Sequence, residues 1–262
     1  MTPLEHWPVA ERARIRGVLT DIDDTLTTGG ALAPEARQAL LRLRDAGLPV
    51  FALTGRPAGW SAPLALDWPL EAIVAENGAV ALWREPDGRL GKDWLQDEQA
   101  RRANARHLQA VARQVLARVP GARLAEDSPG RETDIAIDHS EFHHLDRQQI
   151  SAVVRVMEEA GLRATVSSIH INGWIGDHDK LAGARWILHR QMGISLDAEL
   201  AHWVYIGDST NDAVMFAHCL HSVGVANIAR FAAELTHAPR HVTRLERGAG
   251  FAELAHALLA AR

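Results

Sequence analysis

One short stretch near the N-terminus constrains the fold more than any other: an apolar run from Ile15 to Leu19 leads directly into Asp21, Asp23 and Asp24. A short apolar run bounded by turn-forming residues is typical of an interior strand of a parallel sheet. Because side chains alternate along a strand, Asp21 and Asp23 leave its end on the same side. Two carboxylates at such a short distance repel one another unless a cation lies between them. The stretch therefore predicts a buried strand that ends in an acidic, metal-binding site.

The composition excludes several classes of protein. With 262 residues, 47% hydrophobic and 23% charged, the chain can build one large domain or two smaller ones. A net charge of −5 without a basic stripe argues against nucleic-acid or membrane-surface partners. Cys219 is the only cysteine, so neither an internal disulfide nor a cysteine-based zinc site can form. We expect a soluble cytoplasmic protein without signal peptide or membrane span; monomer and homodimer both stay open.

The first strand continues into a strand–helix–strand unit. A helix over residues 34–47 is predicted by its early proline and its final glycine. A second apolar strand, residues 48–53, then ends at Thr54. Because such units join parallel neighbours, Asp21 and Thr54 should lie at the ends of adjacent strands.

The pattern changes in the middle of the chain. A third strand over residues 72–75 is followed by a hairpin partner over 79–83 and a linker around Gly88. Strands over 91–95, 133–138 and 164–172, with helices over 97–119 and 147–160, predict an α+β module. We therefore predict an inserted cap domain at residues 85–178 and a core formed by residues 1–84 and 179–262. Glycines at the second crossing would suit a mobile lid.

After Lys180 the alternation of helix and strand resumes. Helices over 181–192, 212–220 and 250–261 surround strands over 203–206 and 222–226. The predicted fold class is α/β, a Rossmann-like parallel sheet with helices on both faces plus the inserted cap.

Three predicted strands end in polar residues suited to phosphate chemistry: Asp21 and Asp23; Thr54; and Asp208 with Asn211 and Asp212. Converging carboxylates and carbonyls form an all-oxygen site that suits Mg²⁺. A carboxylate can also attack phosphorus, while a second one, such as Asp23, moves the proton.

Lysine is scarce enough to be informative. Of 28 basic residues only Lys92 and Lys180 are lysines. Lys180 lies where the insertion rejoins the core, and a compact ammonium there would offset the negative charge of a nucleophile and a phosphoryl group.

These motifs resemble those of a known family. Asp21-Ile22-Asp23-Asp24-Thr25-Leu26, Leu53-Thr54-Gly55, Lys180 and Gly207-Asp208-Ser209-Thr210-Asn211-Asp212 are similar, in order, to the four motifs of the haloacid dehalogenase-like phosphohydrolases. Glu76-Asn77-Gly78-Ala79 and the large insertion resemble the branch with a type IIB cap, which includes sucrose-phosphate and mannosyl-phosphoglycerate phosphatases and phosphomannomutase.

The resemblance implies roles by position. Asp21 would be nucleophile and metal ligand, Asp23 the acid/base that also lends its carbonyl to the metal, and Asp208 a metal ligand. Thr54 would bind phosphate and Lys180 would clamp charge. Asn211 and Asp212 would support the metal waters or Lys180. Asp24 stands where many relatives have glycine, and its role stays open.

Substrate-binding candidates follow from position as well. Gly55, Arg56 and Asn77 lie just beyond strand ends, although Arg56 could equally form a surface ion pair. Ser168, His170 and Asn172 alternate along one predicted strand and face either the substrate or solvent. Glu132, Asp134 and Asp138 alternate too, and we expect these to be exposed.

The predicted function is that of a Mg²⁺-dependent phosphatase acting on a small phosphate ester, with a sugar phosphate as the substrate that the branch resemblance implies. A phosphosugar mutase would use the same residues. A non-catalytic phosphometabolite-binding protein is the alternative from another class.

Overall fold

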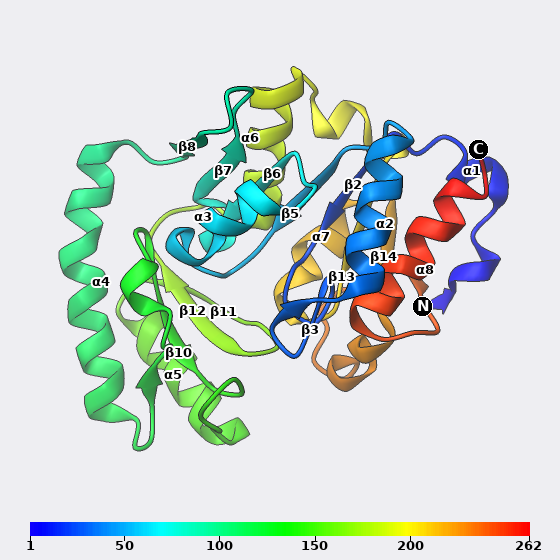
Figure 1. Ribbon diagram of the computed structural model, residues 1–262. Helices are drawn as coiled ribbons and strands as arrows, with labels where there is room; N and C mark the ends of the chain where they lie inside the picture. The colour runs from blue at the N-terminus through cyan, green and yellow to red at the C-terminus, as the bar shows by residue number, and fades with distance from the viewer.

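The computed structural model describes residues 1–262 and contains two main sheets, each covered by helices (Figure 1). The larger sheet has nine strands in the order β1-β15-β14-β13-β2-β5-β6-β7-β8. Neighbours from β1 to β6 are parallel, whereas β7 and β8 are antiparallel to their neighbours. The strands are β1 Thr2–Pro3, β2 Gly17–Thr20, β5 Val50–Leu53, β6 Ala72–Ala75, β7 Val80–Arg84, β8 Leu90–Trp94, β13 Trp203–Gly207, β14 His221–Gly224 and β15 His241–Val242.

Helices cover both faces of this sheet, as predicted. Val18 and Val50 pack towards one face with α2 and α8, whereas Leu19 and Phe51 pack towards the other with α6 and α7. Figure 1 shows α2 and α8 side by side although they are far apart in the chain. The helices of this part are α1 Val9–Arg12, α2 Pro34–Asp45, α3 Ala58–Asp67, α6 Lys180–Met192, α7 Ala213–His218 and α8 Arg247–Leu259. None of the helices in the chain combines the length and apolar character needed to cross a membrane.

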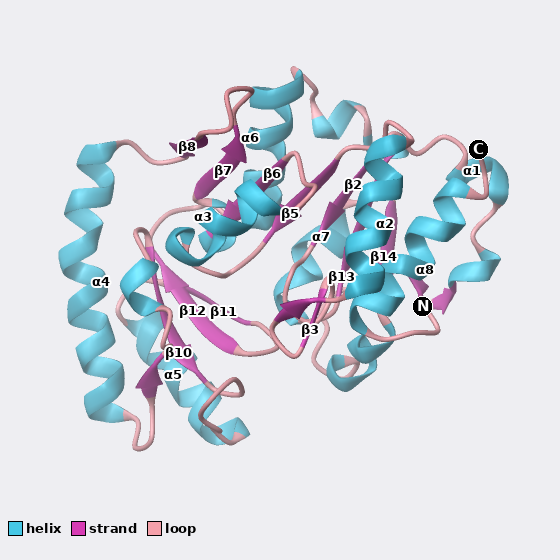
Figure 2. Ribbon diagram, viewed as in Figure 1, coloured by secondary structure: helices cyan, strands magenta, loops and turns pink.

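The second sheet is antiparallel, in the order β11-β12-β10-β9, and lies with α4 and α5 at one end of the molecule (Figure 2). Its elements are α4 Glu98–Arg118, β9 Arg123–Leu124, β10 Asp134–Asp138, α5 Arg147–Glu159, β11 Arg163–Val166 and β12 His170–Trp174. Ile135, Ile137 and Ile171 pack in one core with apolar residues of the two helices. Because strand side chains alternate, His170 and Asn172 face the other way, towards the large sheet.

Short elements complete the chain. A small hairpin, β3 Thr27–Thr28 and β4 Ala31–Leu32, follows the acidic stretch and was not expected from the sequence. The 3-10 helices are η1 Leu4–His6, η2 Glu76–Gly78, η3 Ser128–Gly130, η4 Leu196–Ala198, η5 Leu200–His202, η6 Thr210–Asp212 and η7 Ala226–Phe231.

Two expectations about the insertion differ from the structure. The strand expected at 91–95 is β8, which pairs with β7 in the large sheet rather than with the second sheet. The single strand expected over 164–172 is a hairpin of β11 and β12, because Ser167 closes a turn with His170 through its amide (2.8 Å) and hydroxyl. The boundaries of the cap at residues 85–178 stay a prediction.

Candidate active site

Four neighbouring strands of the large sheet end at one edge, and a polar side chain follows each of them. Asp208 follows β13, Asp21 follows β2, Thr54 follows β5 and Glu76 follows β6. The amide of Asp21 still donates to Ile206 (2.9 Å), and that of Thr54 donates to Val74 (2.9 Å). The prediction that Asp21 and Thr54 end adjacent parallel strands is confirmed. This edge is where open parallel sheets bind ligands.

Lys180 joins this edge from the first residue of α6. Its Nζ lies 2.6 Å from Asp21 Oδ1 and 2.5 Å from Asp212 Oδ1. Burial acts to lower the pKa of Lys180, but the charges of the two carboxylates outweigh it and raise the pKa. Gly78 allows η2 to approach α6 closely, because a Cβ there would collide with the carbonyl of Asp179. The Glu-Asn-Gly turn thereby helps to place the lysine.

Asp212 is fully buried and both of its oxygens are engaged. Its Oδ2 accepts the amides of Asp208 (2.9 Å) and Ser209 (3.1 Å). Its Oδ1 accepts Lys180 and the hydroxyl of Tyr205. Asp212 therefore holds Lys180 and the loop after β13 together, and its supporting role in the site stays a prediction.

The remaining carboxylates suit a divalent cation. Oxygens of Asp21, Asp208 and Asp212 all lie within 4.8 Å of one another. Burial raises the pKa of Asp21 to about 8 against the opposing charge of Lys180, and burial with the charges of Asp21 and Asp212 raises that of Asp208 well above its usual range. Asp208 Oδ1 is buried without a hydrogen-bond partner. Such an orphaned oxygen fits a metal ligand, so Asp21 and Asp208 can hold Mg²⁺.

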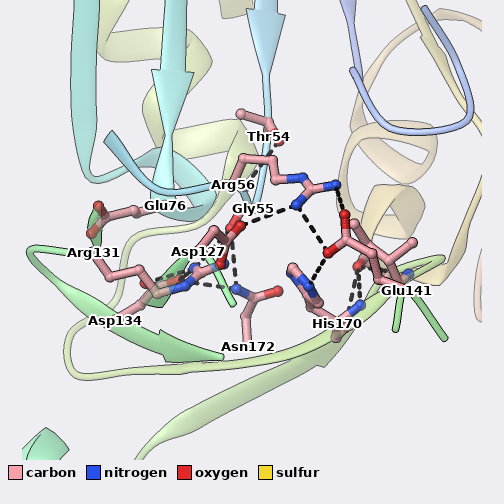
Figure 3. A network of polar contacts seen from close by, with 12 residues as sticks. Thr54, Gly55, Arg56, Glu76, Asp127, Arg131, Asp134, Glu141, His170 and Asn172 are labelled. Carbon is pink, nitrogen blue, oxygen red and sulfur yellow. Dashed lines mark hydrogen bonds and ion pairs between the residues drawn. The ribbon is translucent and has the colours of Figure 1, made fainter. Parts of the chain in front are cut away.

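Arg56, from the loop after β5, contacts Asp23 at this edge and also acidic residues in the loops beside the second sheet (Figure 3). Its Nε and Nη2 contact Asp23 at 3.0 Å, while Nη1 contacts Asp127 at 3.1 Å and Nη2 contacts Glu141 at 2.6 Å. The interpretation of Arg56 as a surface ion pair is wrong, since its side chain is only 5% exposed. Burial acts to lower the pKa of Arg56, but Asp23 and Glu141 outweigh it and raise the pKa.

The sequence model of the haloacid dehalogenase-like hydrolases matches residues 18–108. The matched range contains β2 with the Asp21 stretch, β5 with Thr54 and the turn at Glu76. Over this range the chain is similar to the haloacid dehalogenase-like hydrolases. No curated protein matches the sequence.

Solved structures share the fold across nearly the whole chain. A protein from Thermoplasma acidophilum aligns with a TM-score of 0.70 at 19% identity, over 94% of this chain and 98% of that one. The sucrose-phosphatase of Synechocystis sp. PCC6803, in complex with sucrose and phosphate, aligns with a TM-score of 0.64 at 16% identity, over 92% and 97%. A haloacid dehalogenase-like hydrolase from B. subtilis gives 0.59 at 16% identity, over 92% and 99%.

The second sheet lies over the acidic edge and closes a cavity against it. Asp21, Asp23 and Arg56 line one side of the cavity between them, and Ser168, His170 and Asn172 line the other. The cavity holds only about 10 Å³, roughly the room for one water molecule. With the second sheet in this position, the cavity has no room for a molecule much larger than water.

The three predicted cap residues reach this cavity from different places. Ser168 lies in the turn between β11 and β12, and its hydroxyl is buried without a partner. His170 Nε2 lies 2.8 Å from Glu141 Oε2, and Asn172 Nδ2 donates to the carbonyl of Gly55 at 3.1 Å. Figure 3 shows His170 and Asn172 pointing from the cap towards the loop that carries Arg56. That they contact substrate stays a prediction.

The expectation that Asp134 and Asp138 are exposed is wrong. Asp134 is buried against Arg131, whose Nη1 lies 2.9 Å from it and also donates to the carbonyl of Gly55. Burial raises the pKa of Asp134 to about 7, against the charge of Arg131. Asp138 is fully buried because it accepts amides of the loop that follows it. Alternating charge indicates that one face of the sheet is polar, and here the part of the chain that contains the large sheet covers this face.

Asp24 has a left-handed backbone, with a φ of 54°. Glycine adopts this conformation without strain, and aspartate tolerates it better than most residues. Its Oδ1 lies 3.0 Å from Arg247 Nε, and Asp24 is not among the residues that line the cavity. Asp24 therefore closes the turn after the strand and leaves the cavity to its neighbours.

The other predicted residues occupy mixed positions. The Thr54 hydroxyl accepts the amide of Arg56 at 3.0 Å, so it shapes the loop. Asn77 is buried with an unpartnered Nδ2, and it lines a second cavity with Lys180 and Asn211. The phosphate- and substrate-binding roles of Thr54, Gly55 and Asn77 stay predictions.

Sequence reasoning missed Glu76, Glu141, Tyr205 and Asn227 as parts of this site. Asn227 Nδ2 donates to Asp208 Oδ2 at 3.2 Å. Glu76 follows a strand end directly, which is a usable signal. Nothing in the local sequence distinguishes Glu141 from other loop acids.

Proposed function

We propose that the protein is a Mg²⁺-dependent phosphomonoester hydrolase that acts on a small phosphorylated metabolite, a sugar phosphate, through an aspartyl-phosphate intermediate. The contact between Asp21 and Lys180 supports this most directly. Lys180 contacts Asp21 Oδ1, which leaves the second oxygen of a buried carboxylate free to attack. A buried ammonium beside a nucleophile is suited to phosphoryl transfer, which depends mainly on positioning and charge stabilisation.

In the first half-reaction, the free oxygen of Asp21 attacks phosphorus and the bond from phosphorus to the ester oxygen breaks. Asp23, held by Arg56, gives its proton to the leaving alcohol oxygen. Mg²⁺ bound by Asp21 and Asp208 would supply positive charge for the phosphoryl oxygens. Lys180 holds Asp21 in place and offsets its charge.

In the second half-reaction, a water molecule attacks the phosphorus of the aspartyl phosphate. Asp23 takes one proton from this water, the bond from phosphorus to Asp21 breaks, and inorganic phosphate leaves. Asp23 thus ends protonated and Asp21 ends as a carboxylate, which is the state that the next turnover needs.

The lining of the cavity supports a hydroxyl-bearing substrate. Of the residues that line it only Ile169 is apolar, and hydroxyl, amide and imidazole groups predominate. Such groups recognise the hydroxyls of a sugar or polyol. Sucrose and phosphate occupy the sucrose-phosphatase that shares this fold.

The test is Asp21→Asn, assayed with p-nitrophenyl phosphate and Mg²⁺. We expect this variant to release no phosphate above background while it remains folded by circular dichroism. Asp24→Asn is the matched control, because Asp24 is paired with Arg247 and does not line the cavity, and asparagine tolerates its backbone conformation. Wild-type turnover by Asp21→Asn would show that the nucleophile is elsewhere. A requirement for a sugar bisphosphate, without phosphate release, would indicate a mutase instead.

A further inference from the structure

Glu141 reaches Arg56 from a loop of the cap whose backbone is held in place by Asp138. The buried carboxylate of Asp138 holds that loop by four hydrogen bonds. Its Oδ1 accepts the amides of Ser140 (3.1 Å) and Glu141 (2.9 Å), and its Oδ2 those of Phe142 (2.9 Å) and His143 (3.1 Å). The orientation of Glu141 is therefore built into the loop.

Glu141 makes a two-point contact with Arg56. Its Oε1 lies 2.6 Å from Nη2 and its Oε2 lies 3.1 Å from Nη1, while His170 Nε2 contacts Oε2 at 2.8 Å. Burial acts to raise the pKa of Glu141, but the hydrogen bonds from His170 and Arg56 outweigh it and lower the pKa to about 2. Glu141 therefore carries a full negative charge near neutral pH.

The charges around Arg56 do not balance. One guanidinium contacts three acidic side chains, those of Asp23, Asp127 and Glu141. Even with Asp23 protonated, as the first half-reaction requires, two carboxylates face the single charge of Arg56. Arg131, which shares Asp127 with Arg56, is also paired with Asp134. The side of the cavity next to Asp23, where the leaving group departs, thus has an excess of negative charge. Its uncommitted hydrogen-bonding group is the neutral hydroxyl of Ser168.

We propose that Glu141 is a specificity-determining residue that favours phosphate esters with a neutral, hydroxyl-bearing leaving group over esters whose leaving group carries a carboxylate. This proposal rests on the proposed function. A hydroxyl can bond with Ser168, which lines the cavity, without disturbing the contact between Arg56 and Glu141. A carboxylate that reached Arg56 or His170 on the cavity wall would lie close to Glu141, which contacts both side chains, and like charges repel strongly in a partly dry cavity.

The opposite outcome has a clear structural form. An anionic leaving group could displace Glu141 and take its place on Arg56. Glu141 would then lose both arginine contacts and keep only His170 as a partner. Removing one partner from a buried charge pair is more costly than keeping the pair intact, so we expect the neutral ester to be preferred.

The test compares two esters that differ at one carbon: glycerol 3-phosphate ends in a hydroxymethyl group and 3-phosphoglycerate in a carboxylate. Their dissociation constants are measured by calorimetry with Mg²⁺ on the Asp21→Asn protein, which needs no turnover. We expect the neutral ester to bind about tenfold more tightly. Adding Glu141→Gln should bring the ratio close to one, mainly by tighter binding of 3-phosphoglycerate, whereas Glu141→Asp should retain the preference.

Glu159→Gln is the matched control, because it also removes a cap carboxylate paired with an arginine, here Arg118 on the surface. Its ratio of the two dissociation constants should equal that of the Asp21→Asn protein without a second substitution. Equal or tighter binding of 3-phosphoglycerate by the Asp21→Asn protein, an unaltered ratio in Glu141→Gln, or no binding of either ester would overturn the proposal. Turnover of p-nitrophenyl phosphate by the wild-type protein tests the proposed phosphatase activity separately. If the wild type is active but the Asp21→Asn protein does not discriminate between the esters, only the role of Glu141 is rejected. If the esters are discriminated but the wild type is inactive, only the phosphatase activity is rejected.

Discussion

Glu76, at the end of core strand β6, accepts two hydrogen bonds from Thr133 of the cap, one from its amide at 2.6 Å and one from its hydroxyl at 2.5 Å. The same carboxylate accepts the amides of Ala58 (2.9 Å) and Glu132 (3.0 Å). Glu76 is fully buried and has a left-handed backbone with a φ of 51°. The Glu76 carboxylate accepts hydrogen bonds from four donors and so connects the residues before β10 with the large sheet.

We predict that Glu76→Gln lowers the free energy of unfolding by about 2 to 4 kcal/mol, because an amide would turn N–H groups towards N–H donors and leave them unpaired. Urea denaturation measures this change. Thr133→Val, which removes one donor and leaves the carboxylate with its other partners, should lower it by only about 1 kcal/mol. A Glu76→Gln protein as stable as wild type would show that the cap does not depend on this contact.

Lys180→Arg should reduce kcat about a hundredfold or more, although the charge is conserved. The ammonium is 1% exposed between two carboxylates, and a planar guanidinium is too large to take the same place. Lys92→Arg, at the only other lysine, should keep wild-type kcat because its side chain is partly exposed. Steady-state hydrolysis of p-nitrophenyl phosphate measures both. Equal activity of the two variants would remove the argument for a buried point charge.

Arg56→Lys should affect alkyl phosphates more than p-nitrophenyl phosphate. Arg56 holds Asp23 by Nε and Nη2, and a lysine would lose this two-point contact. An alkyl leaving group needs the proton of Asp23, whereas p-nitrophenolate leaves readily without one. We expect kcat to fall about 10- to 100-fold for glycerol 3-phosphate and much less for p-nitrophenyl phosphate.

Arg131→Lys is the control for that experiment, since Arg131 is equally buried but contacts Asp134 and Asp127 rather than Asp23. It should change both substrates to the same extent. If Arg56→Lys also changed both equally, Arg56 would be structural and would not position Asp23.

His178 predicts a pH dependence of stability. Burial, and then the charge of Arg163, lower its pKa to about 4 against the opposing charges of Asp179 and Asp177. In the unfolded chain the pKa returns to about 6.5, so the unfolded state binds more protons between these values. The stabilisation is therefore complete above pH 6.5 and is lost as the pH falls towards 4.

The expected loss from this histidine is about 2 to 3 kcal/mol, measured by urea denaturation at pH 7 and pH 4.5. His178→Gln should show a smaller decrease over this range than wild type. His256→Gln, at an exposed position of α8, should keep the wild-type decrease. An identical decrease in all three proteins would mean that other groups cause the acid sensitivity.

The core of the site was predictable because its residues follow strand ends that the sequence marks. Apolar runs located β2, β5, β6 and β13, and parallel pairing brings the residues after them to one edge. Asp21 and Lys180 meet although 159 positions separate them, because α6 starts at that edge. Local pattern and the chirality of strand crossovers together carry this much information.

The cap was harder to predict because its packing partners are distant in sequence. The hairpin of β11 and β12 contains only short strands, so a continuous alternating run concealed the turn at Ser167. The alternation predicts an exposed carboxylate at Asp134, whereas the structure buries it, because alternation identifies a polar face but not what covers that face.

The sequence alone therefore determined the class of fold, the acidic edge and the identity of the residues around it, because strand periodicity and turn chemistry are local properties. Only the tertiary structure decided which charges meet. Arg56 contacts Asp23, Asp127 and Glu141 because cap and core close on one another, and no local pattern encodes that distance. The acidic stretch after β2 is thus visible in the local sequence. The network of charges that Arg56 forms around Asp23 exists only where the second sheet lies against the large one.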